Sequence, residues 1–262
     1  MEKNNNPIMS IKELRMSYGG DDVLKGIDLD IYEGEIIGYI GPNGAGKSTT
    51  VKILLGIINS YRGYVEIFGE DISKGSIEYK KRIGYVPETA EIYDNLTAQE
   101  YLTFIGGIYG LSYNAVDEKA KKLMSLFGIE QHYTSRISSF SKGMKQKVLI
   151  IASLIHNPDI LFWDEPLSGL DANSVMIVKE LLSELAAQGK TIFYSSHIMD
   201  VVEKISNRII LINNGQVVAD GTFEELKGKE SEESLEEIFN QLTGFNGHRE
   251  IAEEFIAVLK ER

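Results

Sequence analysis

The sequence contains no cysteine in its 262 residues, and it is short of basic side chains. Without cysteine the chain forms no disulfide and carries no thiolate chemistry, which fits a protein of a reducing cytosolic compartment. Lysine and arginine number 27 against 39 acidic residues, so the net charge is −12. Because a nucleic-acid-binding surface needs an excess of basic charge, this balance argues against nucleic acid as a partner.

Long hydrophobic runs are missing as well. Runs such as Val148–Ile155 are far shorter than the ~20 residues that a membrane-spanning helix needs. The first ten residues, MEKNNNPIMS, have no apolar stretch of the kind found in a signal peptide. We therefore expect a protein that is soluble by itself and reaches a membrane only through a partner. Apolar residues still make up 43% of the chain, enough for the core of one large domain, with or without an appendage.

The sequence does contain a phosphate-binding pattern within residues 36–52, IIGYIGPNGAGKSTTVK. An apolar strand over Ile36–Ile40 precedes a glycine-rich turn, and a helix is predicted from Lys47 to about Ile58. The pattern G-x-x-x-x-G-K-S is complete in this strand–loop–helix context. Glycines let backbone N–H groups surround a polyphosphate, and the helix N-terminus adds partial positive charge. The expected nucleotide contacts are Gly41, Pro42, Asn43, Gly44, Ala45, Gly46, Lys47, Ser48 and Thr49, of which Ser48 would also bind Mg²⁺.

Two adjacent carboxylates end a second apolar strand, in the segment ILFWDEP at residues 160–166. In a doubly wound sheet, ligands bind at the carboxyl ends of the strands, so Asp164 is expected to face the Mg²⁺ held by Ser48. Glu165 is then placed to deprotonate a water for attack on a γ-phosphate. His197 follows another predicted strand, at residues 191–195, where its imidazole can contact the same phosphate.

A second anion-binding element is predicted at FSKGMKQK, residues 140–147. Ser141 is a good N-cap for the helix that follows, and Gly143 permits close approach of a ligand. One chain does not need two such sites for one triphosphate. Two copies arranged head to tail would explain the second site, because each would offer this helix to the nucleotide of the other.

The remaining patterns predict a mainly parallel α/β fold. Strands and turns are expected over residues 8–35, helices over 89–157, and strands alternating with helices from residue 159 onward, among them a helix from Val175 to Gln188. Thr97 and Glu100 form a predicted capping box. After residue 222 the chain becomes acidic and helical, with five glutamates within 230–237. Apolar stripes within 235–242 and 251–259 favour two helices packed on the core, with a partner or dimer contact as the alternative.

Taken in order, these motifs resemble those of the nucleotide-binding subunit of ABC transporters, over about residues 8–221. GPNGAGKST resembles Walker A, FSKGM the signature motif, and ILFWDE Walker B with its catalytic glutamate. Residues 168–171 resemble the D-loop, and His197 the switch histidine. Tyr18, which local pattern alone favours as a half-buried strand residue, falls where the family places an aromatic that stacks on adenine. Glu88 in place of a glutamine, with Lys142 and Met144 in the signature, resembles a bacterial subset of Ecs-like proteins and of drug and antibiotic exporters.

The resemblance implies an ATPase with ATP and Mg²⁺ as cofactors, the cation being bound by Ser48, Asp164 and Glu88. It also implies a P-loop NTPase core with a mainly parallel sheet and an N-terminal antiparallel β subdomain. An α-helical subdomain at about 89–157 is inserted within a nucleotide-binding domain of residues 1–221, and residues 222–262 form a helical extension.

The partners implied are a second copy or a homologous ATPase subunit, and an integral-membrane permease. The permease would dock near Glu88–Tyr101, where Ile92, Tyr93 and Leu96 are either exposed anchors or core residues. The subunit would be cytoplasmic, peripheral on the inner face of the cell membrane, and would power transport, with export favoured over import.

Two other function classes remain as alternatives. A soluble ABC-type ATPase of translation or DNA maintenance would carry two cassettes or a long coiled coil, whereas this chain has one cassette and no sustained heptads. A regulatory module that binds ATP without hydrolysing it would not need Glu165. A GTPase is disfavoured because the base-reading pattern N-K-x-D is absent.

Overall fold

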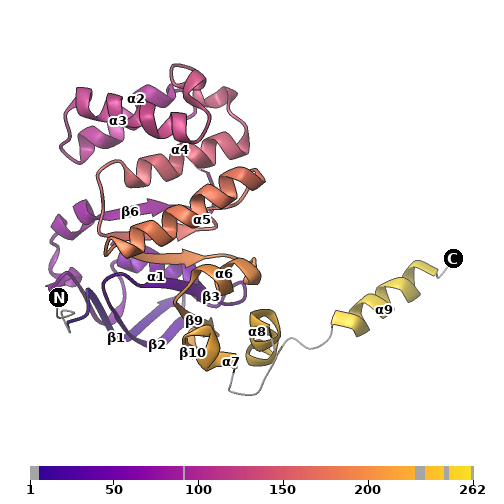
Figure 1. Ribbon diagram of the computed structural model, residues 1–262. Helices are drawn as coiled ribbons and strands as arrows, with labels where there is room; N and C mark the ends of the chain where they lie inside the picture. The colour runs from indigo at the N-terminus through magenta and orange to yellow at the C-terminus, as the bar shows by residue number, and fades with distance from the viewer. Residues whose placement is uncertain (1–5, 91, 228–233, 245–247, 261–262) are drawn as a thin grey trace.

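The chain folds into two β-sheets surrounded by helices (Figure 1), in a computed structural model that describes residues 6–90, 92–227, 234–244 and 248–260. The strands are β1 (Met9–Tyr18), β2 (Asp21–Ile31), β3 (Ile36–Ile40), β4 (Arg62–Ile67), β5 (Glu70–Asp71), β6 (Ile83–Val86), β7 (Ile160–Asp164), β8 (Thr191–Ser195), β9 (Arg208–Asn213) and β10 (Gln216–Gly221). The α-helices are α1 (Lys47–Leu54), α2 (Ala98–Ile108), α3 (Tyr113–Leu126), α4 (Lys142–Leu154), α5 (Ala172–Ala187), α6 (Met199–Ile205), α7 (Phe223–Lys227), α8 (Leu235–Thr243) and α9 (His248–Lys260). Short 3₁₀ helices lie at Ile72–Lys74, Glu78–Arg82, Glu130–His132 and Ile137–Ser139.

The larger sheet has six strands in the order β10-β9-β3-β8-β7-β6. Its strands are parallel except β10, which pairs antiparallel with β9 after a tight turn. The smaller sheet is antiparallel, in the order β2-β1-β4-β5. The predicted α/β class, with a mainly parallel core and an antiparallel N-terminal sheet, is confirmed.

The central strand β3 is buried on both faces, which is why its sequence is almost uniformly apolar. Ile36 and Ile40 pack into a core shared with α4, α5 and α6, on one face of the sheet. Ile37 and Tyr39 pack into a second core, shared with α1 and the antiparallel sheet on the opposite face. These two cores fix the carboxyl end of β3, from which the phosphate-binding loop emerges.

Helices α2, α3 and α4 form a group on the far side of the large sheet from β1 and β2 (Figure 1). The predicted capping box at the start of α2 is present: the Thr97 side chain accepts from the Glu100 backbone N–H, and Glu100 accepts from Thr97. The predicted N-cap of α4 is also present, since Ser141 Oγ accepts a hydrogen bond from the Met144 backbone N–H at 3.2 Å. Both caps therefore formed as their local sequences indicated.

Two predicted helix bounds were wrong. Helix α1 ends at Leu54 rather than near Ile58, because Gly56 takes a left-handed conformation (φ 60°) and closes the helix. The backbone N–H groups of residues 56 and 57 donate to Ile53 O and Lys52 O, which is the Schellman pattern. Helix α5 begins at Ala172 because Asp171 caps it, three residues before the predicted start at Val175.

The C-terminal helices differ from each other. Helix α8 packs on the core as favoured, with Leu235 fully buried and Ile238 buried. Helix α9 contradicts the favoured packing: Ile251, Phe255 and Leu259 are 54%, 67% and 69% exposed, and the helix projects away from the sheets (Figure 1). Residues 230–233 of the acidic run, and residues 245–247 between the two apolar stripes, lie outside the described residues. Within the described ranges, no helix is both long and apolar enough to span a membrane.

Candidate functional site

The loop that follows β3 is shaped by two glycines with no space for a side chain. A Cβ on Gly41 would lie 2.2 Å from the Ile212 carbonyl oxygen. Gly46 has a φ of 109°, and a Cβ there would lie 2.6 Å from a methyl carbon of Leu24. Since side chains are excluded at both ends, residues 41–46 keep their backbone close to α1 and available to a ligand.

The N-terminus of α1 is free to bind an anion. Its N-cap, Gly46, supplies no side-chain hydrogen bond, and no acidic residue occupies the first turn. The first N–H groups of a helix have no partner within the helix, and the helix dipole makes this end partly positive. The combination favours a phosphate at this point.

Lys47 lies across the loop in the structure. Its Nζ donates to Gly41 O at 2.6 Å and to Pro42 O at 3.1 Å. Burial lowers the pKa of this amine, while the nearby carboxylates of Asp164, Glu165 and Glu88 act in the opposite direction. The ammonium group is therefore the positive centre of a cluster of three carboxylates.

A cavity of about 390 Å³ lies over this loop and collects most of the residues predicted from sequence. Gly41 and Pro42 line the neighbouring cavity instead. Of the residues around the 390 Å³ cavity, only Val23 was missed by the sequence analysis, because an isolated valine on a strand carries no functional signal. The lining residues are Tyr18, Val23, Asn43, Gly44, Ala45, Gly46, Lys47, Ser48, Thr49, Glu88, Asp164, Glu165 and His197.

Tyr18 lies at the end of β1 and contributes an aromatic ring to this cavity. The residue is 50% exposed, so it does not belong to the core, and it lines the cavity. Tyr18 is thus a half-buried residue at the end of a strand, as the local pattern indicates, and it also lines the cavity; its stacking on adenine stays a prediction.

The carboxylates after β7 are held by the end of the neighbouring strand β8. Ser195 Oγ donates to Asp164 Oδ1, and the backbone N–H of Glu165 donates to Ser195 O at 3.1 Å. Glu165 has a left-handed backbone (φ 48°), which is unusual for a residue with a side chain. Strained residues of this kind persist where the surrounding structure fixes them, commonly at functional sites.

The Glu165 carboxylate is held next to His197. Glu165 Oε1 accepts a hydrogen bond of 2.7 Å from the His197 backbone N–H, and His197 Nε2 lies 3.8 Å from the same oxygen. Burial raises the pKa of Glu165, and His197 partly offsets this effect. A carboxylate with a raised pKa at a cavity wall is suited to accept a proton. Ser195 and Ser196, the polar residues that link β8 to this pair, were not predicted from sequence. Their position just before His197 marks the segment, but nothing local indicates which carboxylates they contact.

The oxygen atoms around the cavity fit a hard cation. Ser48, Asp164 and Glu88 line the same space and supply a hydroxyl and two carboxylates. Among the described residues, no group of three His, Cys, Asp or Glu side chains forms a metal cage. A cation with few protein ligands, completed by water and phosphate oxygens, is the usual arrangement for Mg²⁺.

Ser141 and Gly143 lie away from this cavity, at the start of α4. Gly143 packs against the loop after β7, where a Cβ would lie 2.4 Å from Gly169 O. Within one chain, the structure therefore does not bring these two residues to the phosphate-binding loop.

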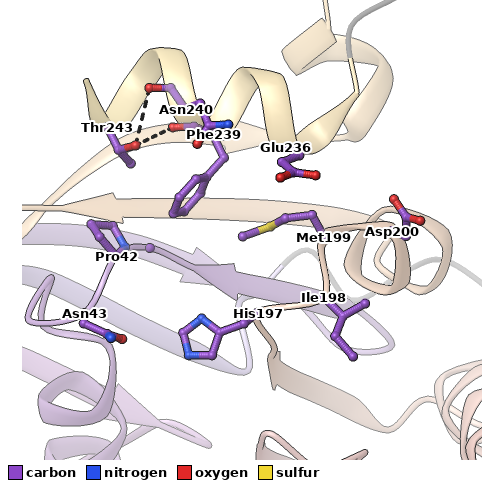
Figure 2. Close-up of a pocket in the computed structure, with 11 residues that line it drawn as sticks. Pro42, Asn43, His197, Ile198, Met199, Asp200, Glu236, Phe239, Asn240 and Thr243 are labelled. Atoms are coloured by element: carbon purple, nitrogen blue, oxygen red, sulfur yellow. Dashed lines mark hydrogen bonds between the residues drawn. The ribbon is translucent and has the colours of Figure 1, made fainter. Parts of the chain in front are cut away.

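A second cavity, of about 630 Å³, lies beside the loop (Figure 2). One wall is formed by Pro42, Asn43 and His197, and the other by α8. In Figure 2, the Phe239 and Met199 side chains point into the space between α8 and the loop. The C-terminal segment therefore forms part of the surface next to the predicted phosphate site, which the sequence motifs did not indicate.

Known proteins are similar to this chain in sequence and in fold. The ABC transporter family matches residues 24–168. The ABC transporter ATP-binding protein NatA of Bacillus subtilis (strain 168) is 38% identical over 218 residues, covering 82% of this chain and 88% of NatA. The ABC-type transporter ATP-binding protein EcsA of the same organism is 32% identical over 238 residues, covering 90% of this chain and 96% of EcsA. The dimeric structure of the ATP-binding cassette MJ0796 in a post-hydrolysis state, bound to ADP and Pi, matches with a TM-score of 0.75 and 25% identity, covering 82% of this chain and 99% of that one.

Proposed function

The chain belongs to the ABC transporter family, in which it is an ATP-binding and ATP-hydrolysing subunit, and from this premise we propose how its residues and partners carry out that activity. The observation that carries the proposal is the 390 Å³ cavity, which brings a phosphate-binding loop, three carboxylates and a histidine together from four separate parts of the chain. Fold similarity alone would not assign these roles, and the shared cavity supports them because it brings the residues together.

The nucleotide lies in this cavity, with its phosphates on residues 41–49. Backbone N–H groups of the loop and the start of α1 bind the phosphate oxygens. The Lys47 ammonium group exchanges the loop carbonyls for the β- and γ-phosphates, and Tyr18 stacks on the base. The loop thus supplies both charge and shape for a triphosphate.

Mg²⁺ would be held by the hydroxyl of Ser48 and the carboxylates of Asp164 and Glu88, which line the same cavity. When bound, the cation offsets the negative charge of the phosphates. Asp164 is oriented for this role by the Ser195 hydroxyl. Glu88 is exposed at the cavity wall and adds a charge that a glutamine would not.

Glu165 is the general base. It takes a proton from a water that attacks the γ-phosphate in line, and its raised pKa favours proton acceptance. His197 contacts the γ-phosphate, and its backbone N–H fixes the position of the Glu165 carboxylate. The two residues therefore act as one unit at the hydrolysis site.

Two copies assemble head to tail, each completing the site of the other. Within one chain, Ser141 and Gly143 start a helix whose N-terminus lies outside the nucleotide cavity. In a two-fold dimer this N-terminus meets the γ-phosphate of the opposite copy, and the interface is isologous. The related cassette MJ0796 supports this arrangement, since it has been solved as a dimer.

The membrane partner is an integral permease that docks near residues 88–101. Tyr93 is 63% exposed and forms the anchor, while Ile92 and Leu96 are half-buried and pack on the core beneath it. This contact makes the subunit peripheral on the cytoplasmic face, and the Ecs-like motif variants favour export. Residues 1–221 act as the nucleotide-binding domain, with 89–157 as its helical subdomain, and 222–262 as an added extension.

The dimer is tested in a Glu165→Gln background, where ATP persists. Light scattering after size-exclusion chromatography is expected to give a dimer with Mg-ATP and a monomer with ADP, which lacks the γ-phosphate. Adding Ser141→Arg is expected to block the dimer by bulk while fluorescent ATP still binds the monomer. A dimer that persists in this double variant would overturn the head-to-tail arrangement. Phosphate release by the wild type separates hydrolysis from the regulatory alternative, in which ATP binds without turnover.

A further inference from the structure

Polar contacts join the first turns of α4 to the segment that follows Glu165. Lys142 Nζ donates to Ser168 Oγ at 2.7 Å. One turn further along, Gln146 Nε2 donates to Pro166 O at 3.1 Å, and Gln146 is only 1% exposed. Lys147 Nζ lies 3.1 Å from Asp171 Oδ2. These contacts join the first turns of the helix to three residues of the segment 166–171.

The start of α4 and the loop after β7 are in close contact. A Cβ on Gly143 would lie 2.4 Å from Gly169 O, and a Cβ on Gly169 would lie 3.0 Å from Lys142 Cγ. The stem of Lys142 therefore lies directly on the loop, and its ammonium group reaches past Gly169 to Ser168. Because packed interiors are not continuously deformable, a shift at the start of α4 moves this loop with it.

Ser168 belongs to the same turn as Glu165. Its backbone N–H donates to Glu165 O at 3.1 Å. The Glu165 carboxylate in turn accepts from the His197 backbone N–H. A short path of direct contacts thus runs from Lys142, at the start of α4, to the proposed base and to the histidine beside it.

We propose that Lys142 is a positioning residue for ATP hydrolysis that couples the two nucleotide sites of the dimer. This rests on the proposed head-to-tail function, in which Ser141 meets the nucleotide of the opposite copy. A nucleotide bound there fixes the first turn of α4, and Lys142 transmits the constraint through Ser168 to Glu165 of its own site. Each Glu165 is then fully positioned only when the other site is filled, so the two sites hydrolyse ATP cooperatively.

We assign this role to Lys142 rather than to Gln146 or Lys147 because Lys142 is exposed and lies next to Ser141. Gln146 and Lys147 are buried and hold the helix permanently on the loop. Lys142 is exposed and directly follows Ser141, so its contact is the one next to an incoming nucleotide. A lysine at a helix N-terminus is disfavoured by the helix dipole, and its hydrogen bond to Ser168 offsets that cost.

The test is a double-mutant cycle on purified protein, with Lys142→Met, Ser168→Ala and both together. Steady-state phosphate release is measured against ATP concentration with Mg²⁺, giving kcat, KM and the Hill coefficient. Each single variant is expected to lose about 10-fold in kcat, within the range of coupling between contacting residues, and to lower the Hill coefficient to 1. The double variant is expected to be no worse than either single one. Fluorescent ATP should bind each of these variants as tightly as it binds the wild type.

Lys145→Met is the matched control, since Lys145 lies on the same helix but pairs with Asp94, at 2.8 Å. It is expected to keep the wild-type Hill coefficient, and Lys142→Arg, which retains a donor, is expected to recover part of the lost kcat. An unchanged Hill coefficient in Lys142→Met would overturn this inference but not the proposed function. The same holds if the losses in kcat of the two single variants multiply in the double variant. A wild type with a Hill coefficient of 1 and no nucleotide-dependent dimer would overturn the head-to-tail function, and this inference with it.

Discussion

Replacing Glu165 with glutamine tests whether Glu165 accepts a proton, because the change removes the carboxylate but keeps the size and hydrogen bonding of the side chain. In the structure, Glu165 Oε1 accepts a 2.7 Å hydrogen bond from the His197 backbone N–H. A glutamine offers an amide oxygen to the same N–H and has nearly the same size. The left-handed turn at residue 165 and the position of His197 are therefore expected to survive the change, while the group that accepts the proton is lost.

The expected loss in kcat follows from this removal of the carboxylate. If only the general base is removed, turnover should fall by about 10²- to 10⁴-fold, the range for this form of catalysis. This corresponds to about 3–5 kcal/mol of barrier. ATP affinity should be retained, because residues 41–49 are unchanged. Phosphate release at saturating Mg-ATP measures the loss, and fluorescent-nucleotide titration provides the affinity control.

The pH dependence gives an independent check. Because burial raises the pKa of Glu165, the acid limb of the wild-type rate should lie above the usual carboxyl range, and the residual rate of Glu165→Gln should lack that limb. The raised pKa also favours the protonated folded state, so this group's contribution to stability is present at low pH and is lost as pH rises through the pKa. The stability of Glu165→Gln relative to the wild type should therefore increase as the pH rises above the ordinary carboxyl pKa. Turnover within a few-fold of the wild type, with the acid limb retained, would refute the assignment of Glu165 as the base.

Two further predictions concern the cavity wall and the C-terminal helices. Glu88→Gln removes one of the carboxylates near Lys47. Because one charge that repels the phosphates is lost, the variant should bind ATP a few-fold more tightly than the wild type in the absence of Mg²⁺. Equal ATP affinities in the variant and the wild type would place Glu88 outside this group of charges. Leu235→Ala should lower the free energy of unfolding by about 2–5 kcal/mol because Leu235 is fully buried. Truncation after Gly244 should change the free energy of unfolding by less than about 0.5 kcal/mol, because the apolar residues of α9 are exposed. Urea titration measures the free energy of unfolding of both variants. A larger loss on truncation would show that α9 packs on the core.

The parts of the site that were predicted from sequence depend on local rules. The phosphate-binding role proposed for residues 41–49 depends on backbone geometry that glycines and one helix start determine, so a short segment contains the necessary information. The helix caps at Thr97 and Ser141 were predictable for the same reason. Asp164 and Glu165 followed from a general property of parallel sheets, whose carboxyl strand ends gather at one edge.

The parts that were not predicted depend on contacts between distant segments. Ser195 orients Asp164 across 31 positions of sequence, and no local pattern announces that pair. Gly56, whose left-handed backbone ends helix α1, also lies against Tyr79 and Lys80, which approach it from another element. The apolar stripe of α9 has the same periodicity as that of α8, so periodicity alone could not separate a packed helix from an exposed one.

The left-handed backbone at Glu165 has a consequence for protein engineering. An L-residue with a side chain costs about 1–2 kcal/mol in this conformation, whereas glycine, and to a lesser degree asparagine, adopts it easily. A search that selects variants only by thermal tolerance would therefore favour replacing the residue assigned here as the base. Libraries screened for robustness would accumulate inactive proteins at this position unless turnover is selected in parallel. At the strained turn, selection for heat resistance and selection for enzymatic activity therefore favour different residues.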